Sequence, residues 1–146
     1  MTLLELKATK GRILGVDFGE ARTGLAVSDL SRFLASGLGN VQGGGLEKTA
    51  ERILGVAAEQ SAVAIVLGLP VNMNGTEGPK AERIRELAAI LERTLPVYLI
   101  DERMTTMAAS RFLNETNTRG QKRKQVIDTL SAQIILQNAL DRLKHC

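Results

Sequence analysis

The first strongly patterned stretch of the chain is an apolar strand that carries a carboxylate. Its residues alternate between two faces with the period of two that marks a β-strand, and Asp17 shares one face with Ile13 and Gly15. A turn containing glycine follows, and the run TGLAVSD then reads as a second strand. This order predicts a β-hairpin. A short third strand is expected over residues 38–41, before the glycines at 43–45 end any regular element.

Further along, helical and strand patterns alternate. Apolar residues recur at helical spacing over 46–60, which predicts an amphipathic helix. The run at 62–70 is apolar without alternation, as is typical of a central parallel strand covered on both faces. A helix capped by Thr76, with Pro79 in its first turn, and a strand at 96–103 are expected next. Strand, helix and strand in this order predict a βαβ unit with a right-handed crossover.

The C-terminal third is expected to be mainly helical. One helix is predicted to begin near Thr105, and a last helix is predicted over residues 124–143. Between them the segment NTRGQKRK predicts a basic loop. Its cations are Arg119, Lys122, Arg123 and Lys124. The chain is therefore expected to form an α/β fold, with a mixed five-stranded sheet that begins antiparallel, ends parallel and is flanked by helices.

Composition favours a single domain. The 146 residues, of which 44% are hydrophobic, suffice for one core, so we expect one domain over residues 1–146 with a short N-terminal tail of about residues 1–10. The only cysteine is Cys146, so no internal disulfide is possible and a reducing compartment, the cytoplasm, fits best. The first residues are too few and too charged for a signal or membrane helix, and no membrane partner is expected.

Net charge alone does not identify a partner. A formal charge of +3 and a pI of about 9.3 permit nucleic-acid binding without requiring it. The basic segment could equally be a solvated surface. Aromatic residues make up 3% of the chain, too few to stack many bases, so any recognition would depend on backbone charge and shape. The single histidine, His145, lacks the further ligands that a zinc site needs.

Three acids stand where solvation alone does not explain them. Asp17 lies in a strand among glycines that leave room for a ligand or another backbone. Glu102 ends a later strand, and its neighbour Asp101 must point to the opposite face. Asp128 falls on a small, mainly apolar face of the last helix, which can pack closely on a sheet. Each acid also has a structural explanation, as a turn cap, an ion-pair partner of Arg103 and a helix N-terminal charge, respectively.

If these acids converge, the repulsion between their charges limits the kinds of site that they can form. Two carboxylates about 4 Å apart repel by roughly 4 kcal/mol at an effective dielectric of about 20. A divalent cation offsets this more simply than a strongly raised pKa, and oxygen ligands suit Mg²⁺ or Mn²⁺. An acidic metal cluster beside a basic segment points to phosphodiester hydrolysis, because metal ions can activate water and stabilise the leaving oxygen. The hypothesis is a metal-dependent nuclease.

Four motifs in this order resemble the YqgF/RuvX family, described as Holliday-junction resolvase-like proteins and as nucleases of the 16S ribosomal RNA precursor. They are GVDFGEARTGLAVSD, VLGLPVNMNGTEGPKAERI, YLIDERMTT and KRKQVIDTLSAQIILQ. The similarity runs from about residue 11 to residue 143. The resemblance implies a ribonuclease H-like fold, a bacterial cytoplasmic location and a divalent-metal nuclease site. It makes Asp17, Glu102 and Asp128 the catalytic and metal-binding acids.

The sequence departs from the family pattern at two places. Ala21 stands where a lysine commonly precedes Arg22, which leaves Arg22 as the phosphate contact of the first turn. The strand at 62–70 ends without an acid, although many ribonuclease H-like nucleases place a catalytic carboxylate there. Glu102 would then substitute from the neighbouring strand. The resemblance therefore supports the presence of a bound metal ion more strongly than it supports a two-metal arrangement.

Other functions remain open at this stage. The 16S ribosomal RNA precursor is the favoured substrate, and a Holliday-junction DNA endonuclease is the alternative; junction cutting would favour a homodimer. A noncatalytic protein of the same fold could also use the basic segment to hold RNA or DNA. An actin-like or sugar-kinase ATPase shares the hairpin, but such proteins close two domains around ATP, and the chain has no P-loop.

Overall fold

The computed structural model describes residues 1–102 and 120–146, and only the helical backbone over 120–128. The strands in this part of the chain are β1 (Arg12–Asp17), β2 (Arg22–Ser28), β3 (Ala35–Gln42), β4 (Ala62–Leu69) and β5 (Val97–Asp101). The helices in the same residues are α1 (Leu3–Ala8), α2 (Leu46–Glu59), α3 (Pro79–Leu91) and α5 (Gly120–Lys144). The helix expected to begin near Thr105 lies outside the described residues.

The strands form one five-stranded sheet in the order β3-β2-β1-β4-β5. β1 is antiparallel to β2, and β2 is antiparallel to β3, whereas β4 is parallel to both β1 and β5. The expected mixed sheet is therefore confirmed. β4 lies between two parallel partners, as its continuous apolar run predicted, although the middle strand of the five is β1.

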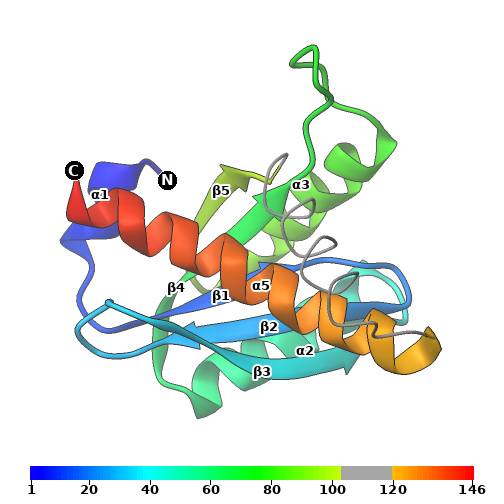
Figure 1. Cartoon of the computed structure of the whole chain (residues 1–146), viewed down its shortest axis with the longest axis horizontal. Coiled ribbons are helices and arrows are strands. Elements are labelled where there is room, and N and C mark those ends of the chain that lie inside the picture. Colours follow the sequence, from blue (N-terminus) through cyan, green and yellow to red (C-terminus); the bar gives the residue numbers. More distant parts are fainter. Residues whose placement is uncertain (103–119) are drawn as a thin grey trace.

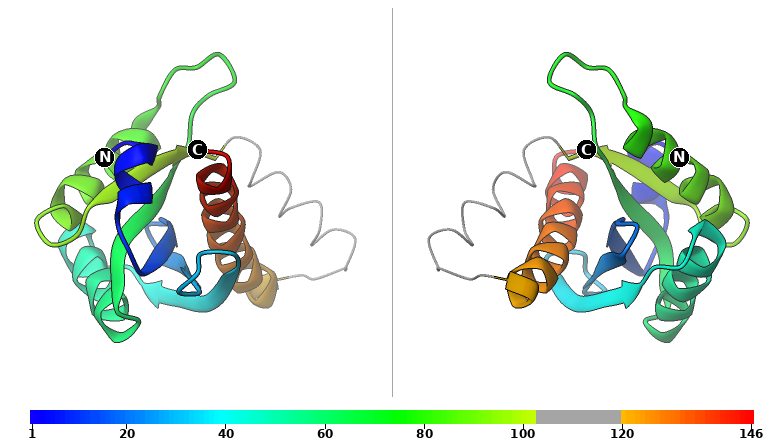
Figure 2. Two further views of the ribbon diagram at one scale, coloured as in Figure 1. Left: turned by 90° about the vertical axis from the view of Figure 1, so that its left-hand side faces the viewer. Right: turned by 90° about the vertical axis from the view of Figure 1, so that its right-hand side faces the viewer.

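Helices cover both faces of the sheet (Figures 1 and 2): α2 and α3 lie on one face and α5 crosses the other. The alternation along β1 divides its side chains between two hydrophobic clusters. Leu14 and Val16 belong to the cluster under α2 and α3, whereas Ile13 belongs to the cluster under α5. Because β1 and β4 contribute to both clusters, both strands are mostly buried.

The first ten residues, expected to be a tail, contain the docked helix α1. Thr2 and Glu5 form a capping box: Glu5 N donates to Thr2 Oγ1 at 3.1 Å, and Thr2 N donates to Glu5 Oε1 at 2.9 Å. Leu6 is fully buried in the cluster under α5. The helix is therefore part of the core that covers the α5 face.

The hairpin and its third strand are present, but the third strand is longer than expected. β3 begins at Ala35, because its pairing with β2 extends from Ser28 to the far end at Arg22. A short span over 38–41 was predicted from a weak pattern, since the strand carries exposed positions along much of its length. Edge strands have one unpaired side and need less apolar character.

Thr76 was wrongly predicted to cap the second helix. α3 begins at Pro79, with Gly78 at the cap position and no side-chain cap hydrogen bond. Thr76 instead closes the preceding loop: its hydroxyl donates to Asn74 Oδ1 at 2.7 Å and accepts from Asn72 Nδ2 at 3.0 Å. Pro79 at the first helical position was correctly predicted, because its fixed φ suits a helix start.

The last helix begins earlier than the pattern predicted. α5 starts at Gly120, so the backbone of Lys122, Arg123 and Lys124 is helical and these cations do not belong to a loop. Arg119, the remaining cation of the basic segment, lies outside the described residues. The helical pattern was obscured there by glycine and by a run of charges. Over the described part of the chain, no helix combines the length and apolarity needed to cross a bilayer.

Candidate functional site

The candidate site lies on the face of the sheet that α5 covers. Asp17, half-buried, ends β1 on the same face as Gly15. A side chain on Gly15 would place its Cβ 2.6 Å from Leu136 Cβ and 3.1 Å from Ala132 O of α5. Glycine is therefore required at position 15 because α5 packs directly on the strand. This close packing brings the helix to the strand that ends in Asp17.

Glu102 follows β5 and turns to the same face. Along β5 the side chains of Val97 and Ile100 enter opposite clusters, so the alternation directs Asp101 towards α2 and α3 and Glu102 towards α5. Glu102 N donates to Leu69 O at 3.2 Å, which continues the pairing of β5 with β4 beyond the last strand residue. The prediction that only one of the two adjacent acids faces the site agrees with this alternation.

A glycine on β4 makes room for the Glu102 carboxylate. Glu102 is only 5% exposed, and a Cβ on Gly68 would lie 2.6 Å from its Oε2 and 2.6 Å from Ile135 Cδ1. Val16 pairs with Leu67, so Asp17 and Gly68 are the next residues on neighbouring strands. Such strands lie about 4.8 Å apart. The Glu102 carboxylate therefore lies over the strand adjacent to the one that carries Asp17.

Burial dominates the electrostatics of Glu102. Desolvation raises its pKa above the ordinary value of 4.5; the positive charge of Lys80 opposes this rise, and the negative charge of Asp101 adds to it. Lys80 is exposed near the start of α3. The pKa of Glu20 is lowered chiefly by its hydrogen bond with Arg83, and the charge of Lys80 adds to this. The sequence analysis did not single out Lys80, because nothing local indicated that α3 begins beside the end of β5.

The third predicted acid is placed by its backbone alone. Asp128 lies in α5 one turn before Ala132, whose carbonyl oxygen approaches Gly15. Its side chain is outside the described residues. Among the side chains that the structure does describe, no three of the types Asp, Glu, His and Cys come together as a metal site. The predicted convergence of three carboxylates therefore remains a prediction, with Asp17 and Glu102 on one face of the sheet.

Ser131 is a further polar group on this side of α5. It is 1% exposed, and its Oγ has no hydrogen-bond partner among the described residues. It lies one turn before Ile135, whose Cδ1 would be 2.6 Å from a Cβ on Gly68. Buried hydroxyls normally find a partner, so an unsatisfied one on the helix that covers Gly68 fits a site that binds a polar ligand. Ser131 follows Asp128 by three residues, so the two share a face of the helix, but the sequence could not show that the serine lacks a partner.

The predicted nucleic-acid contacts are only partly described. Arg22 is half-buried at the start of β2, on the strand next to β1, and its Cα partner on β3 is Gln42. Near this turn Glu20 forms an ion pair with Arg83 of α3, with Nε and Oε1 2.8 Å apart. The turn after β1 is thereby connected to α3. The side chains of the basic segment lie outside the described residues.

The side chains present fit a divalent cation. Asp17 and Glu102 supply carboxylate oxygens, the donors that Mg²⁺ and Mn²⁺ prefer. Gly15 and Gly68 remove the side chains that would otherwise fill the space between the sheet and α5. Ionising a buried carboxylate such as Glu102 is costly unless a positive charge lies near it. The donor set is thus compatible with a metal at this end of the sheet.

Solved structures share this architecture. RuvC of Thermus thermophilus aligns with a TM-score of 0.52 at 15% identity, over 91% of this chain and 96% of that chain. The fowlpox virus Holliday junction resolvase aligns with a TM-score of 0.54 at 12% identity, over 92% of this chain and 99% of that chain. At these identities the likeness concerns the fold alone, and it confirms the expected ribonuclease H-like fold.

Sequence relatives are much closer. A protein of Bradyrhizobium diazoefficiens named as a pre-16S rRNA nuclease is 44% identical over 136 residues, which cover 92% of this chain and 84% of the relative. A protein of Paracoccus denitrificans with the same name is 41% identical over 145 residues, which cover 98% of this chain and 92% of the relative. The RuvX family, described as Holliday junction resolvase, matches residues 11–142. This chain belongs to the RuvX family.

Proposed function

We propose that this chain is a metal-dependent nuclease that hydrolyses phosphodiester bonds of structured nucleic acid, with the 16S ribosomal RNA precursor as its substrate. The observation that carries the proposal is the buried Glu102 carboxylate above Gly68, on the same face of the sheet as Asp17. The names of the relatives support the substrate. The cytoplasm is the compartment in which this substrate would be met.

In this mechanism Asp17, Glu102 and Asp128 would hold Mg²⁺ or Mn²⁺. The ion, when bound, lowers the pKa of a water molecule and stabilises the leaving oxygen. The chain contributes a fixed frame: the packing of α5 on Gly15 holds the helix that carries Asp128 against β1. Burial keeps the Glu102 carboxylate away from bulk water, which strengthens its attraction to any cation at the site.

Cations of the chain hold the substrate backbone. Arg22 lies beside the turn that follows β1, and the basic segment supplies further cations, namely Arg119, Lys122, Arg123 and Lys124. Lys80 adds a positive charge close to Glu102. Phosphate contacts of this kind give affinity that falls with salt and that carries little sequence information. The nuclease would therefore select its cleavage point by the shape of the RNA.

Branched DNA is the second candidate substrate, because the family is described as Holliday junction resolvase. A Holliday junction has two strands to cut, so this function would favour a homodimer. A noncatalytic protein of the same fold is the alternative to both. Cleavage assays with precursor RNA and with four-way DNA junctions, each with and without Mg²⁺ or Mn²⁺, separate the three.

The test of the site compares cleavage by Asp17→Asn, Glu102→Gln and Asp128→Asn with that of the unmodified chain. We expect each substitution to lower the cleavage rate by on the order of 100-fold or more while RNA binding is retained. Asp101→Asn is the matched control, since Asp101 is adjacent in sequence but lies on the opposite face. Unchanged cleavage in all three acid variants would refute the proposed site.

A further inference from the structure

The turn between β2 and β3 exposes three large apolar side chains. Leu30 is 70% exposed, Phe33 59% and Leu34 67%. We call residues 29–34 the hairpin tip. Single exposed apolar residues are ordinary on protein surfaces, but three within five positions form a patch of the kind that binds a partner. The hairpin tip lies at the opposite end of β1 from Asp17, so the proposed catalytic site does not use it.

Side-chain hydrogen bonds hold the hairpin tip against the start of the chain. Arg32 adopts a positive φ of 62°, and its guanidinium crosses to the segment between α1 and β1. Nε donates to Gly11 O at 2.7 Å, Nη1 to Leu6 O at 3.1 Å and Nη2 to Thr9 Oγ1 at 2.8 Å. An apolar surface whose backbone is already ordered loses little conformational entropy on binding.

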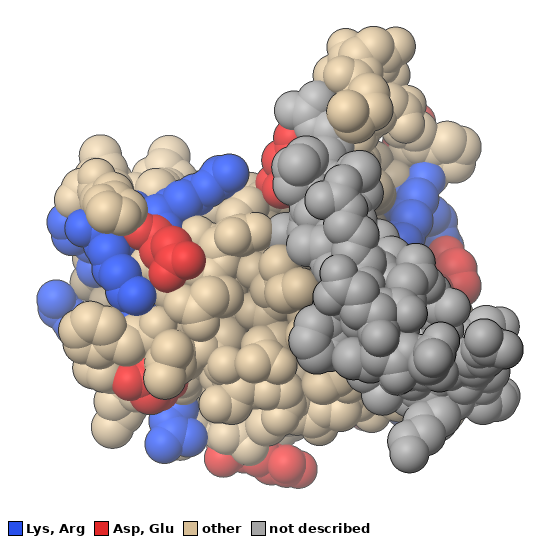
Figure 3. All heavy atoms as spheres, viewed as in Figure 1, with Lys and Arg blue, Asp and Glu red and all other residues tan. Residues whose placement is uncertain are grey.

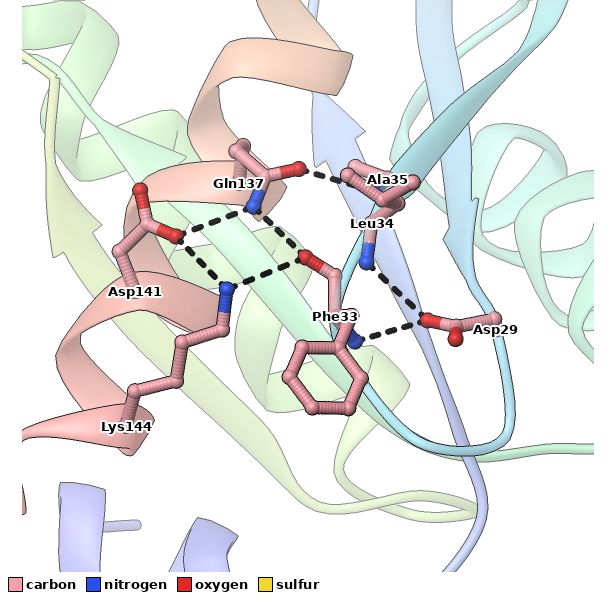
Figure 4. A network of polar contacts seen from close by, with 7 residues as sticks. All are labelled: Asp29, Phe33, Leu34, Ala35, Gln137, Asp141 and Lys144. Carbon is pink, nitrogen blue, oxygen red and sulfur yellow. Dashed lines mark hydrogen bonds and ion pairs between the residues drawn. The ribbon is translucent and has the colours of Figure 1, made fainter.

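The ring of Phe33 stands beside a cation from the far end of the chain (Figure 4). Asp29 Oδ1 accepts from the backbone nitrogens of Phe33 and Leu34 at 2.8 and 3.1 Å. Gln137 Nε2 and Lys144 Nζ of α5 donate to Phe33 O at 3.0 and 3.3 Å. Lys144 Nζ also lies 5.2 Å from the centroid of the Phe33 ring. The exposed ring is therefore both anchored and paired with a positive charge.

A cationic cavity of about 270 Å³ adjoins the hairpin tip. Leu140 and Leu143 of α5 line it together with Lys7, Lys10 and Lys144. Lys144 Nζ also lies 3.4 Å from Asp141 Oδ1, so part of its charge is already compensated. Figure 3 shows Lys and Arg side chains gathered at this end of the molecule, near α1 and the end of α5. Lys144 belongs to both features, so the cavity and the Phe33 ring form one continuous surface.

We propose that this surface binds an unpaired nucleotide of the RNA substrate, with the base stacked on Phe33 and the phosphate among the lysines. An aromatic ring beside a positively charged groove is the combination by which proteins hold single-stranded nucleic acid. A second copy of this chain would bring the same lysines to the contact, and like charges would repel. An acidic protein segment would satisfy the lysines but would leave the ring and cation pairing unexplained.

The inference rests on the proposed function, because it names a second contact for the same substrate. Lys144 lies about 24 Å along the axis of α5 from the position of Asp128. β1 alone spans about 17–20 Å between the two ends of the sheet. Only an RNA that extends well beyond the cleavage point can reach both sites. The surface would therefore favour a precursor with an unpaired extension over a bare stem.

The test measures binding of a labelled RNA stem-loop, with and without a single-stranded uridine extension, by fluorescence anisotropy. The unmodified chain in EDTA and the Asp17→Asn variant both keep the RNA intact. We expect the extension to raise affinity, and Phe33→Ala to weaken binding of the extended RNA by between about 5-fold and 100-fold while binding of the bare stem-loop is unchanged. Phe33→Trp should retain affinity, and Phe33→Leu should lose it.

Charge variants distinguish a phosphate contact made by the lysines of the cavity from the general attraction of RNA to a positively charged protein. Lys10→Gln should reduce the salt dependence of binding to the extended RNA by one phosphate contact, a slope change of about 0.7. Lys48→Gln is the matched control, since Lys48 is exposed on α2 across the sheet. Circular dichroism and urea unfolding should show that the Phe33, Lys10 and Lys48 variants remain folded, because these side chains are exposed.

The outcomes distinguish this inference from the proposed function. If Phe33→Ala binds the extended RNA as well as the unmodified chain does, while cleavage of precursor RNA persists, the inference is overturned and the nuclease stands; the hairpin tip would then be a surface for protein. If Phe33→Leu retains the affinity of Phe33→Trp, the contact is merely apolar and base stacking is overturned. If no RNA binds, both proposals fail.

Discussion

At Gly68 the absence of a side chain leaves the space that the carboxylate of Glu102 occupies. A Cβ there would lie 2.6 Å from Glu102 Oε2, closer than such atoms approach. The obstructing atoms are the ends of the Glu102 and Ile135 side chains, which can move aside. A substitution would therefore displace the carboxylate before it disrupts the strand.

Gly68→Ala is expected to lower the free energy of unfolding by about 1–3 kcal/mol and to reduce cleavage at least about 10-fold, since an overpacked site shifts its side chains. Gly55→Ala is the matched control: a Cβ at this exposed position in α2 meets nothing within 4 Å, and alanine should stabilise the helix by about 1 kcal/mol. Urea unfolding and cleavage assays measure both effects. Full cleavage by Gly68→Ala would contradict the role given to this glycine.

The raised pKa of Glu102 makes stability depend on pH. Because burial raises the pKa in the folded chain above 4.5, the folded state holds this proton more tightly than the unfolded state. The stabilising contribution is complete below pH 4.5 and is lost as pH rises through the higher folded pKa. Glu102→Gln should therefore be more stable than the unmodified chain at neutral pH in EDTA, and this advantage should shrink towards pH 4.5.

Urea unfolding in EDTA at several pH values measures that difference. Glu59→Gln serves as the control, since Glu59 is exposed at the end of α2 on the other face of the sheet. Mg²⁺ should stabilise the unmodified chain more than Glu102→Gln, because ligands that bind only the folded state add to stability. An advantage of Glu102→Gln that stays constant from pH 4.5 to neutral would contradict the assignment to ionisation.

The position of a residue could be predicted where the pattern that reveals it lies in the neighbouring sequence. The period of two placed Asp17 on the face of Gly15 and separated Glu102 from Asp101, because side chains alternate along any strand. Lys80 and Ser131 were not predicted as parts of the site. Their surroundings depend on contacts between elements far apart in the sequence, which no local period encodes.

At the scale of elements, α1 was predicted as a tail but is a docked helix. A helix of six residues is not stable by itself, so packing must hold it. Leu6 supplies that packing: it is fully buried, whereas Leu4 on the same helix is 68% exposed. Short helices of this kind escape sequence analysis, because too few positions are available to show a period of 3.6.

Leu6→Ala is expected to lower the free energy of unfolding by about 2–5 kcal/mol, since it removes a buried side chain and leaves a cavity. Leu4→Ala should change it by no more than about 0.5 kcal/mol, because the side chain is already in solvent. Urea unfolding of the two variants gives the comparison. Equal effects would show that α1 does not contribute to the core.

The observed starts of two helices differ from the predicted ones, because a possible capping residue and a run of charges masked the helical pattern. Thr76 has a residue type that caps helices, yet Gly78 holds that position and the threonine closes the preceding loop. α5 extends back to Gly120 through cations that composition assigned to a loop. Long helices with buried faces override such local preferences, because packing contributes more than the propensity of one turn.

For the molecule as a whole, one sheet covered on two sides explains most of the arrangement. α2 and α3 bury one face, and α5 buries the other at close range over Gly15 and Gly68. The site and the hairpin tip thus occupy opposite ends of the same layer. A substrate that contacts both would lie along α5, which spans that layer (Figure 1).

The amino-acid sequence by itself determined the strands and helices, the mixed sheet, the family and the positions of acids at strand ends, because these follow from periods and motifs within short windows. Only the tertiary structure decided that Glu102 lies above Gly68, that Lys80 stands near it and that Lys144 meets Phe33 across 111 residues. The physical reason is that such contacts depend on how whole elements pack. Packing is a property of the assembled core and is not encoded in any single segment.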